Sequence, residues 1–216
     1  MTFQGWPEEA LEFYEGLEAD NTKTYWTANK AIYDTKVLGP MTELLDELGP
    51  DFGETRMFRP YRDVRFSKDK TPYKTHIGGV IGGLGYIQLS ANGLAAANGM
   101  YEMTADQLDA YRRAVAADDS GQELEQIVGA LEADDIEVHS RDVLKTAPRG
   151  YQTDHPRIEL LRYKGLWAWK AWPVGAWLGT PAAKQRLTDF LVASRPLAEW
   201  LGARVGPSTA APARRR

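Results

Sequence analysis

The sequence predicts an α+β fold, with a mainly antiparallel sheet flanked by N-terminal and C-terminal helices. Apolar residues recur at helical spacing in the first fifty residues and again after residue 180. Between these regions lie a glycine-rich stretch and an Asn-Gly pair, which are typical of strands joined by tight turns. Helices at the ends and strands in the middle are the order expected of an α+β protein.

Three helices are predicted before residue 50. The first begins near Pro7, because proline suits the first helical position, and apolar side chains follow at residues 10, 13, 14 and 17. A second helix covers residues 25–37, and Gly39-Pro40 is expected to end or kink it. A third amphipathic helix follows and is expected to stop at Gly49-Pro50.

Strands are predicted in the middle of the chain. Residues 57–67 alternate with period two, which favours a strand, and residues 67–74 follow as a loop. The five glycines of residues 78–85 indicate close backbone approach or bulges in a curved sheet. Residues 86–90 then form a strand, and the Asn-Gly pair favours a hairpin with a return strand over residues 94–103.

Two capping boxes predict the next helices, one at Thr104 with Gln107 and one at Ser120 with Glu123. The remaining predicted elements are a strand over residues 136–140, a short helix from Pro156, a strand over residues 166–172 and a last helix from Thr180-Pro181. No repeat and no interior linker is visible. We therefore predict a single α+β domain over residues 1–205, followed by a disordered tail over residues 206–216.

Composition narrows the classes of protein. A content of 43% apolar residues indicates a globular chain, and a net charge of −4 argues against a protein that coats nucleic acid broadly. Without cysteine there is no disulfide framework. The N-terminus lacks the features of a signal peptide, and no apolar run is long enough for a membrane span, so a cytoplasmic protein with no membrane partner is expected. The oligomeric state is left open.

Residues 56–76, which we call the basic segment, are the main candidate site. The segment holds seven Lys and Arg against two Asp, a charge of +5 within a chain of −4. Such an excess requires either carboxylate partners from the protein or an anionic ligand, for which Arg offers a planar fork and Lys a mobile charge. The candidate ligand-binding residues are Arg59, Arg62, Arg65, Lys68, Lys70, Tyr73, Lys74 and His76.

A second basic cluster lies further along the chain. Its members are Arg149, Tyr151, His155, Arg157, Arg162 and Lys164. At the start of a predicted helix, His155 is either part of an anion site shared with His76 or a capping or packing histidine. A pocket is better supported if the two basic regions face each other.

Other chemistry finds little support. The three histidines, His76, His139 and His155, do not have zinc-site spacing, so no metal is predicted. Ser67 to Lys70 fits S-x-x-K without its partner motifs, and the glycine run fits no nucleotide motif. No cofactor is predicted.

Three functions remain. The first is binding of a small anionic ligand, bearing phosphate or carboxylate, in a basic pocket. Enzymatic activity is left open, with His76 or His155 as the proton-transfer candidates. The second is a nucleic-acid-binding module that uses the same cations with aromatic stacking. The third is a scaffold protein in which the arginines form internal ion pairs.

The segment RDVRFSKDKTPYKTH also resembles the hallmark of a bacterial and fungal family of uncharacterised conserved proteins, a domain of unknown function. Further matching pieces are DNTKTYWTANKAIYD, ANGLAAANGMYEM and LKTAPRGYQTDHPRIELLRYKGL, so the resemblance extends from about Phe3 to Trp200. The chain departs from the family at Asp20-Asn21, where the pattern has Asn-Asn. The resemblance implies one full-length domain and assigns no activity.

Overall fold

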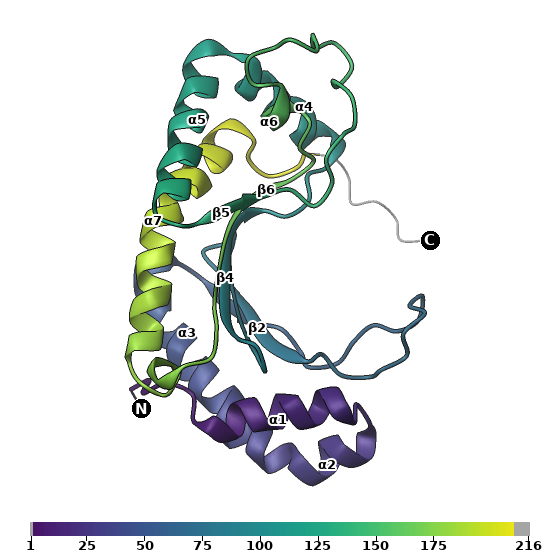
Figure 1. Cartoon of the computed structure of the whole chain (residues 1–216), viewed down its shortest axis with the longest axis vertical. Helices are drawn as coiled ribbons and strands as arrows, with labels where there is room; N and C mark the ends of the chain where they lie inside the picture. The colour runs from purple at the N-terminus through teal and green to yellow at the C-terminus, as the bar shows by residue number, and fades with distance from the viewer. Residues whose placement is uncertain (1, 210–216) are drawn as a thin grey trace. The chain divides into compact units, whose positions relative to one another are not determined.

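The computed structural model describes residues 2–209, and its helices and strands confirm the α+β class. The elements in chain order are α1 (Glu8–Ala19), α2 (Lys23–Ile32), the π-helical segment η1 (Tyr33–Leu38), α3 (Gly39–Phe52), β1 (Thr55–Met57), β2 (His76–Ile81), β3 (Gly85–Ser90), β4 (Gly93–Met100), α4 (Ala105–Ala116), α5 (Asp118–Ala133), β5 (Glu137–His139), α6 (Ile158–Leu161), β6 (Leu166–Trp172), the 3₁₀ segment η2 (Ala176–Gly179) and α7 (Ala182–Arg204). Figure 1 labels most of them.

The strands form one six-stranded sheet in the order β1-β2-β3-β4-β6-β5. Its pairs are antiparallel, with Gly78 opposite Gln88 in β2–β3 and Val138 opposite Ala168 in β5–β6.

The chain forms two compact units. Unit 1 is the chain up to Ala96 together with Ala171–Val192, and unit 2 is Ala97–Lys170 together with the chain from Ala193. One domain over residues 1–205 therefore stays a prediction.

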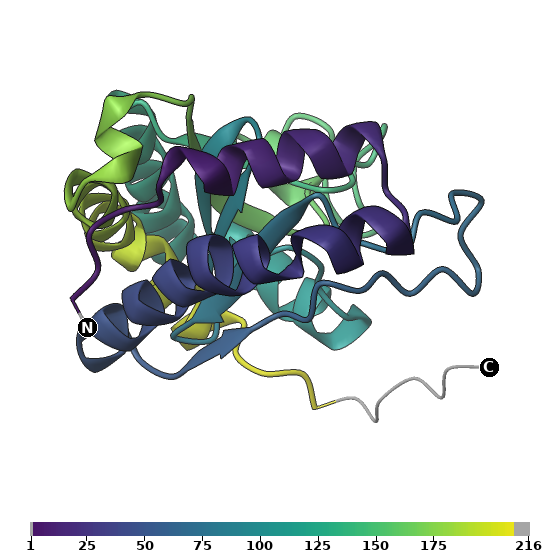
Figure 2. The ribbon, with the colours of Figure 1, turned by 90° about the horizontal axis from the view of Figure 1, so that it is seen from below.

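The first helix of unit 1 begins where the sequence predicts, but the second and third helices do not end at the predicted residues. Pro7 precedes α1, and the side chains of residues 10, 13, 14 and 17 are buried. The helix does not end at Gly39-Pro40, because η1 and α3 continue it, and α3 also runs past the expected stop at Gly49-Pro50 to Phe52. Pro40 has no N–H to donate to the preceding turn, and the Gly39 N–H reaches back five residues to the Asp34 carbonyl in a π-helical bond. Figure 2 shows α1 beside this continuous helical run.

The sheet of unit 1 has one buried face and one half-exposed face. Ile77, Gly79 and Ile81 of β2 are buried, and a Cβ on Gly79 would lie 2.9 Å from Leu45 Cδ1, so α3 packs directly on this strand. The glycine run thus provides close approach, as one of the two sequence interpretations expects. The alternate residues of β2 begin with His76 and lie on the half-exposed face.

The predicted strand over residues 57–67 is wrong. After β1 the basic segment leaves the sheet and returns only at β2, so that Figures 1 and 2 show it as an extended arm of unit 1. A single bridge pairs Tyr61 with Tyr73. Pro60 and Pro72, which have no N–H, stand next to this bridge and cannot donate to a ladder.

Unit 2 is built on α4, α5 and the second half of α7. The predicted capping box at Thr104 and Gln107 is confirmed. The box at Ser120 is wrong, because α5 already begins at Asp118 and the Ser120 hydroxyl donates to the Ala114 carbonyl. Trp200 of α7 donates its indole N–H to the Ser120 carbonyl at 3.0 Å, which fixes α7 against the start of α5.

The predicted tail is described in part. Over residues 206–209 the chain lies at the start of α4, where Ser208 Oγ and Thr209 N donate to the Asp106 carboxylate at 3.0 and 2.7 Å. The remainder, residues 210–216, lies outside the described residues. Within residues 2–209, no helix is long and apolar enough to cross a membrane.

Candidate functional site

Both aspartates of the basic segment are bound by its own arginines. Arg65 donates from Nε and Nη2 to the two oxygens of Asp63, at 2.9 and 2.6 Å. Arg62 forms an ion pair with Asp69 and also donates to the Thr71 hydroxyl. The hydrogen bonds from Arg65 hold the pKa of Asp63 well below its usual range, and those from Thr71 and Arg62 lower the pKa of Asp69 to about 2. These two arginines therefore form internal ion pairs.

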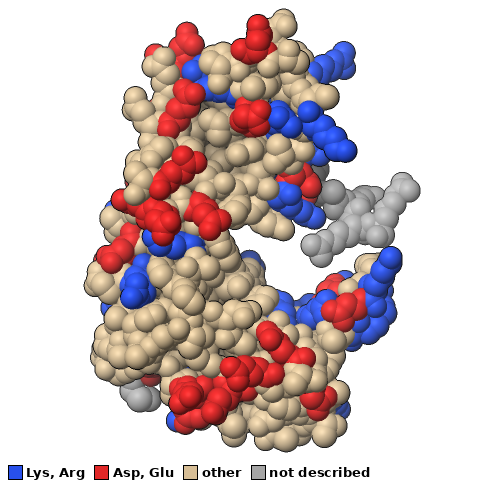
Figure 3. All heavy atoms as spheres, viewed as in Figure 1, with Lys and Arg blue, Asp and Glu red and all other residues tan. Residues whose placement is uncertain are grey.

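Five cations of the segment lack such a partner. Within residues 2–209 no carboxylate forms an ion pair with Arg56, Arg59, Lys68, Lys70 or Lys74. Arg59 and Lys68 are exposed, and Lys70 donates only to the Val64 carbonyl, at 2.9 Å. In Figure 3 Lys and Arg atoms gather around a few carboxylates on this arm, whereas the helices of unit 1 are largely acidic on the same view.

Lys74 lies at the base of the segment. Its Nζ is 5.1 Å from the centroid of the Phe58 ring, and Arg56 approaches the same ring to 5.5 Å. Burial and the neighbouring Arg59 both lower the pKa of Lys74. Two cations and an aromatic ring thus meet here without a counter-ion in the described chain.

Tyr73 anchors the returning end of the segment. Its ring stacks on Trp26 of α2 with centroids 4.3 Å apart and an interplanar angle of 5°. Asn21, in the turn between α1 and α2, receives the Tyr73 N–H at 3.1 Å and donates to the Tyr73 carbonyl at 3.0 Å. Tyr73 is therefore buried and positions the segment. Nothing in the sequence pairs Asn21 with Tyr73 beyond their common presence in the family-like pieces.

The imidazole of His76, the first residue of β2, is half-buried and has no hydrogen-bond partner within the described residues. Burial and the neighbouring Lys74 lower its pKa. His76 shares the half-exposed sheet face with Gly78 and with the paired residues Gln88 and Ser90 of β3. On that face His76 is the group that can take up or release a proton near neutral pH.

Tyr86 crosses this face over a glycine. Its hydroxyl donates to Gln88 Oε1 at 2.9 Å, and a Cβ on Gly78 would lie only 2.7 Å from the same hydroxyl. The Tyr86 ring is 6.1 Å from the Phe58 ring, and burial raises the pKa of Tyr86 to about 12. A glycine at position 78 therefore lets a protonated phenol lie next to the ring that Lys74 covers.

The second basic cluster belongs to unit 2, and Arg157 dominates it. The Arg157 side chain is buried and donates to the carbonyls of Val115, Ala116 and Ala117 at 2.7, 3.2 and 3.3 Å. It also pairs with Asp118 and Glu125 at 3.4 and 3.5 Å. The last carbonyls of a helix lack intrahelical donors, so Arg157 caps the C-terminus of α4.

Other members of this cluster have internal contacts as well. His155 Nδ1 accepts a hydrogen bond from the Arg157 N–H at 3.0 Å. Arg162 donates to the Leu144 carbonyl and to Glu159 at 3.0 Å, and the Lys164 N–H bonds to the Ser140 hydroxyl at 3.1 Å. Arg149 is exposed and Tyr151 is half-buried, and neither side chain has a partner in the described chain.

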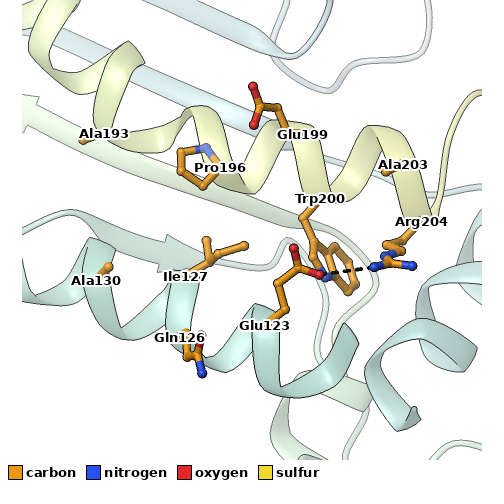
Figure 4. Close-up of a pocket in the computed structure, with 10 residues that line it drawn as sticks. All are labelled: Glu123, Gln126, Ile127, Ala130, Ala193, Pro196, Glu199, Trp200, Ala203 and Arg204. Carbon is orange, nitrogen blue, oxygen red and sulfur yellow. Dashed lines mark hydrogen bonds and ion pairs between the residues drawn. The ribbon is translucent and has the colours of Figure 1, made fainter. Parts of the chain in front are cut away.

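Two surface hollows lie apart from these basic clusters. A groove of about 450 Å³ in unit 2 runs between α5 and α7 and is lined mainly by apolar side chains, as Figure 4 shows. Its Arg204 is paired with Glu123 at 3.3 Å, and Glu199 points away from the groove. In unit 1 a hollow of about 380 Å³ lies between Trp6 and the η2 segment. No three His, Asp or Glu side chains of the described residues gather as metal ligands.

Comparison with known proteins gives one match. A family model described as "Conserved hypothetical protein (DUF2461)" matches residues 9–200. No curated protein and no solved structure matches the chain.

Proposed function

The chain belongs to this family of conserved hypothetical proteins, and on that premise we propose that the base of the basic segment binds a small anionic ligand that bears phosphate or carboxylate. Arg59 and Lys74 bind the charge of the ligand. His76 lies next to them as the group that takes up or releases a proton. Whether bonds change in the ligand is a separate question from binding.

The unbalanced charge is the observation that supports this proposal most. Asp63 and Asp69 neutralise Arg65 and Arg62, so five of the seven basic side chains are left without a carboxylate in the described chain. Surface arginines and lysines usually find partners or spread apart, since like charges repel. Here Arg59 remains close enough to Lys74 to lower its pKa. An anion between them removes this repulsion.

The environment of Lys74 and His76 supports binding at the base rather than at the tip. Both side chains are partly buried, and burial is the main cause of their lowered pKa values. Ion pairs gain more when they are partly removed from water than when they are fully exposed. An anion at this place therefore gains more than one bound by the exposed Lys68 or Lys70.

Affinity measurements test the proposal. We expect inorganic phosphate or a dicarboxylate to bind, and Lys74→Met and Arg59→Gln each to weaken binding by about tenfold or more, since a hydrogen bond to a charged group contributes ~1.5–3 kcal/mol. Isothermal titration calorimetry at low salt measures this. Arg141→Gln in unit 2 is the matched control, because Arg141 is paired with Glu102 at 3.0 Å and should not matter. Equal affinities in all variants, or no binding of any anion, would refute the proposal.

A second function, nucleic-acid binding, is favoured by the exposed aromatics of the same segment. Phe66 is 91% exposed, with Arg65 5.9 Å from its ring, and Tyr61 is 50% exposed. Exposed aromatic rings among cations can stack on the bases of single strands. If this function is correct, a single-stranded oligonucleotide binds with an affinity that falls steeply between about 50 and 200 mM salt, and Phe66→Ala weakens it. Absent or salt-independent binding would exclude it.

A further inference from the structure

Three buried tyrosines of unit 1, Tyr14, Tyr33 and Tyr73, have hydroxyls without a hydrogen-bond partner in the described chain, and Tyr14 and Tyr33 are the more deeply buried of the three. Tyr14 is 1% exposed and Tyr33 is 4% exposed, and neither hydroxyl is hydrogen-bonded within the described chain. Three other tyrosines behave differently. Tyr25 donates to the Phe13 carbonyl at 2.9 Å, Tyr111 to the Leu160 carbonyl at 2.9 Å, and Tyr86 to Gln88. Because buried hydroxyls are normally satisfied, Tyr14 and Tyr33 require another partner.

These two hydroxyls border space that water can enter. Among residues 2–209, Trp6 Nε1 is the one buried side-chain polar atom that lacks a partner and is also closed to solvent. The unpartnered hydroxyls of Tyr14 and Tyr33 therefore keep a small area in contact with solvent, although their rings are buried. They are satisfied by water when no ligand is bound, and a ligand hydroxyl can take the place of that water.

The tyrosines lie next to the proposed anion site. Besides burial, the hydroxyls of Tyr33 and Tyr86 contribute to the raised pKa of Tyr14, and Tyr61 of the basic segment contributes to that of Tyr33, so these groups are electrostatic neighbours. Ring contacts link Tyr33 to the basic segment through Trp26, and link Tyr86 to it through Phe58. Trp26 lies 4.7 Å from Tyr33 and 6.2 Å from Tyr61, and Tyr86 lies 6.1 Å from the Phe58 ring that Lys74 covers.

We infer that the anionic ligand also carries hydroxyl groups, as a sugar phosphate or polyol phosphate does, and that Tyr14 and Tyr33 bind those hydroxyls. This inference rests on the proposed function of the basic segment. A phenol both donates and accepts a hydrogen bond, which matches an alcohol. The rings of Phe58 and Tyr61 offer apolar surface to the C–H groups of a sugar. The phenols stay neutral at physiological pH, so they suit uncharged hydroxyls better than a second charged group.

Four probes separate the parts of the ligand: inorganic phosphate, butyl phosphate, a hexose 6-phosphate and the free hexose. We expect the hexose phosphate to bind about tenfold more tightly than butyl phosphate, which carries the same charged group on an alkyl chain without hydroxyls. Tyr14→Phe combined with Tyr33→Phe should reduce this advantage to about twofold or less. The same double variant should bind phosphate and butyl phosphate as the unchanged protein does. Tyr25→Phe is the matched control, since its hydroxyl is already bonded within the protein.

The outcomes distinguish the two proposals. If phosphate and butyl phosphate bind but the hexose phosphate gains nothing, the inference is wrong and the anion site stands. If the hexose phosphate is preferred but the double Phe variant keeps that preference, other groups bind the hydroxyls and the inference is likewise wrong. If no phosphate compound binds, the proposed function itself fails. Thermal unfolding shows whether each variant folds. If the double variant does not fold, the single variant Tyr33→Phe is tested in its place with the same four probes.

Discussion

The two basic regions of the chain have similar compositions and different structures. In unit 2 the guanidinium of Arg157 is buried and bonded to three carbonyls at the end of α4 and to two carboxylates. In unit 1 the basic segment uses both of its aspartates internally and still leaves five cations without one in the described chain. The first region stabilises a helix end, whereas the second has charge that its own fold does not balance. A local excess of basic residues therefore indicates a candidate site, and the groups that bind those side chains determine whether its role is structural or functional.

The largest expected effect is a loss of stability on substitution of Arg157, the buried arginine of unit 2. Arg157→Met leaves three carbonyls and two carboxylates without their donor, so we expect the free energy of unfolding to fall by about 3 kcal/mol. Urea denaturation measures this. Arg141→Met, which removes one exposed ion pair, should leave the midpoint unchanged. A loss under about 1 kcal/mol for Arg157→Met would mean that the cap contributes little.

A smaller contrast is expected between buried tyrosines. Tyr111→Phe removes a hydroxyl that is bonded to the Leu160 carbonyl, and we expect a loss of about 1 kcal/mol. Tyr14→Phe removes a hydroxyl with no partner in the described chain, so stability should be unchanged or slightly higher. Thermal and urea unfolding compare the two. Equal losses in both variants would indicate that Tyr14 has a structural partner that the static structure does not contain.

His76 should make stability depend on pH. Its pKa in the folded protein lies below the usual 6.5 of histidine, so in the pH window below 6.5 the unfolded chain binds a proton that the folded chain does not. The free energy of unfolding therefore falls as the pH drops through this window and is unaffected above it. Denaturation between about pH 5 and pH 8 measures the slope, and His76→Asn should flatten it.

Bound phosphate should raise the pKa of His76, which an NMR titration measures. A lowered pKa would contradict an anion beside His76.

The smallest effect on stability is expected from Asp63→Asn. Asp63 and Arg65 are exposed, so the melting temperature should stay the same. The substitution removes a negative charge from the segment and releases the Arg65 guanidinium, so anion affinity should increase. Titration calorimetry with phosphate measures this. Decreased affinity would show that Asp63 positions Arg65 for the ligand instead of competing with it.

Much of the fold follows from local patterns. Helical spacing at Phe13, Tyr14 and Leu17 predicts the buried side of α1, and the Asn-Gly pair predicts the turn between β3 and β4. The failures have physical causes. Alternation over residues 57–67 cannot reveal that prolines on both arms prevent a ladder. The Ser120 pattern fits a capping box, but the acidic residues Asp118 and Asp119 before it already begin the helix.

The sequence predicted where the candidate site lies but not which of its side chains are bound within the protein. The charge excess located the basic segment, but the partners of Arg62 and Arg65 depend on how the loop folds back. In the sequence Arg157 could not be distinguished from the basic residues near it. In the structure its guanidinium donates to a carbonyl at the end of α4. Tyr14 and Tyr33 lie at core spacing, and periodicity treats a tyrosine there as an apolar side chain. Only tertiary structure shows that their hydroxyls lack partners.

The π-helical turn of η1 has a consequence for how this family can vary. A wider turn of this kind holds one residue more than an α-helical turn, so it corresponds to a single-residue insertion in a regular helix. Deleting one residue there would restore the α-helix and rotate everything N-terminal to it by about 100° relative to α3. Trp26 would then turn away from Tyr73, and the basic segment would lose its anchor. Chain length between Trp26 and Met41 is thus constrained even where the identity of the intervening side chains is free.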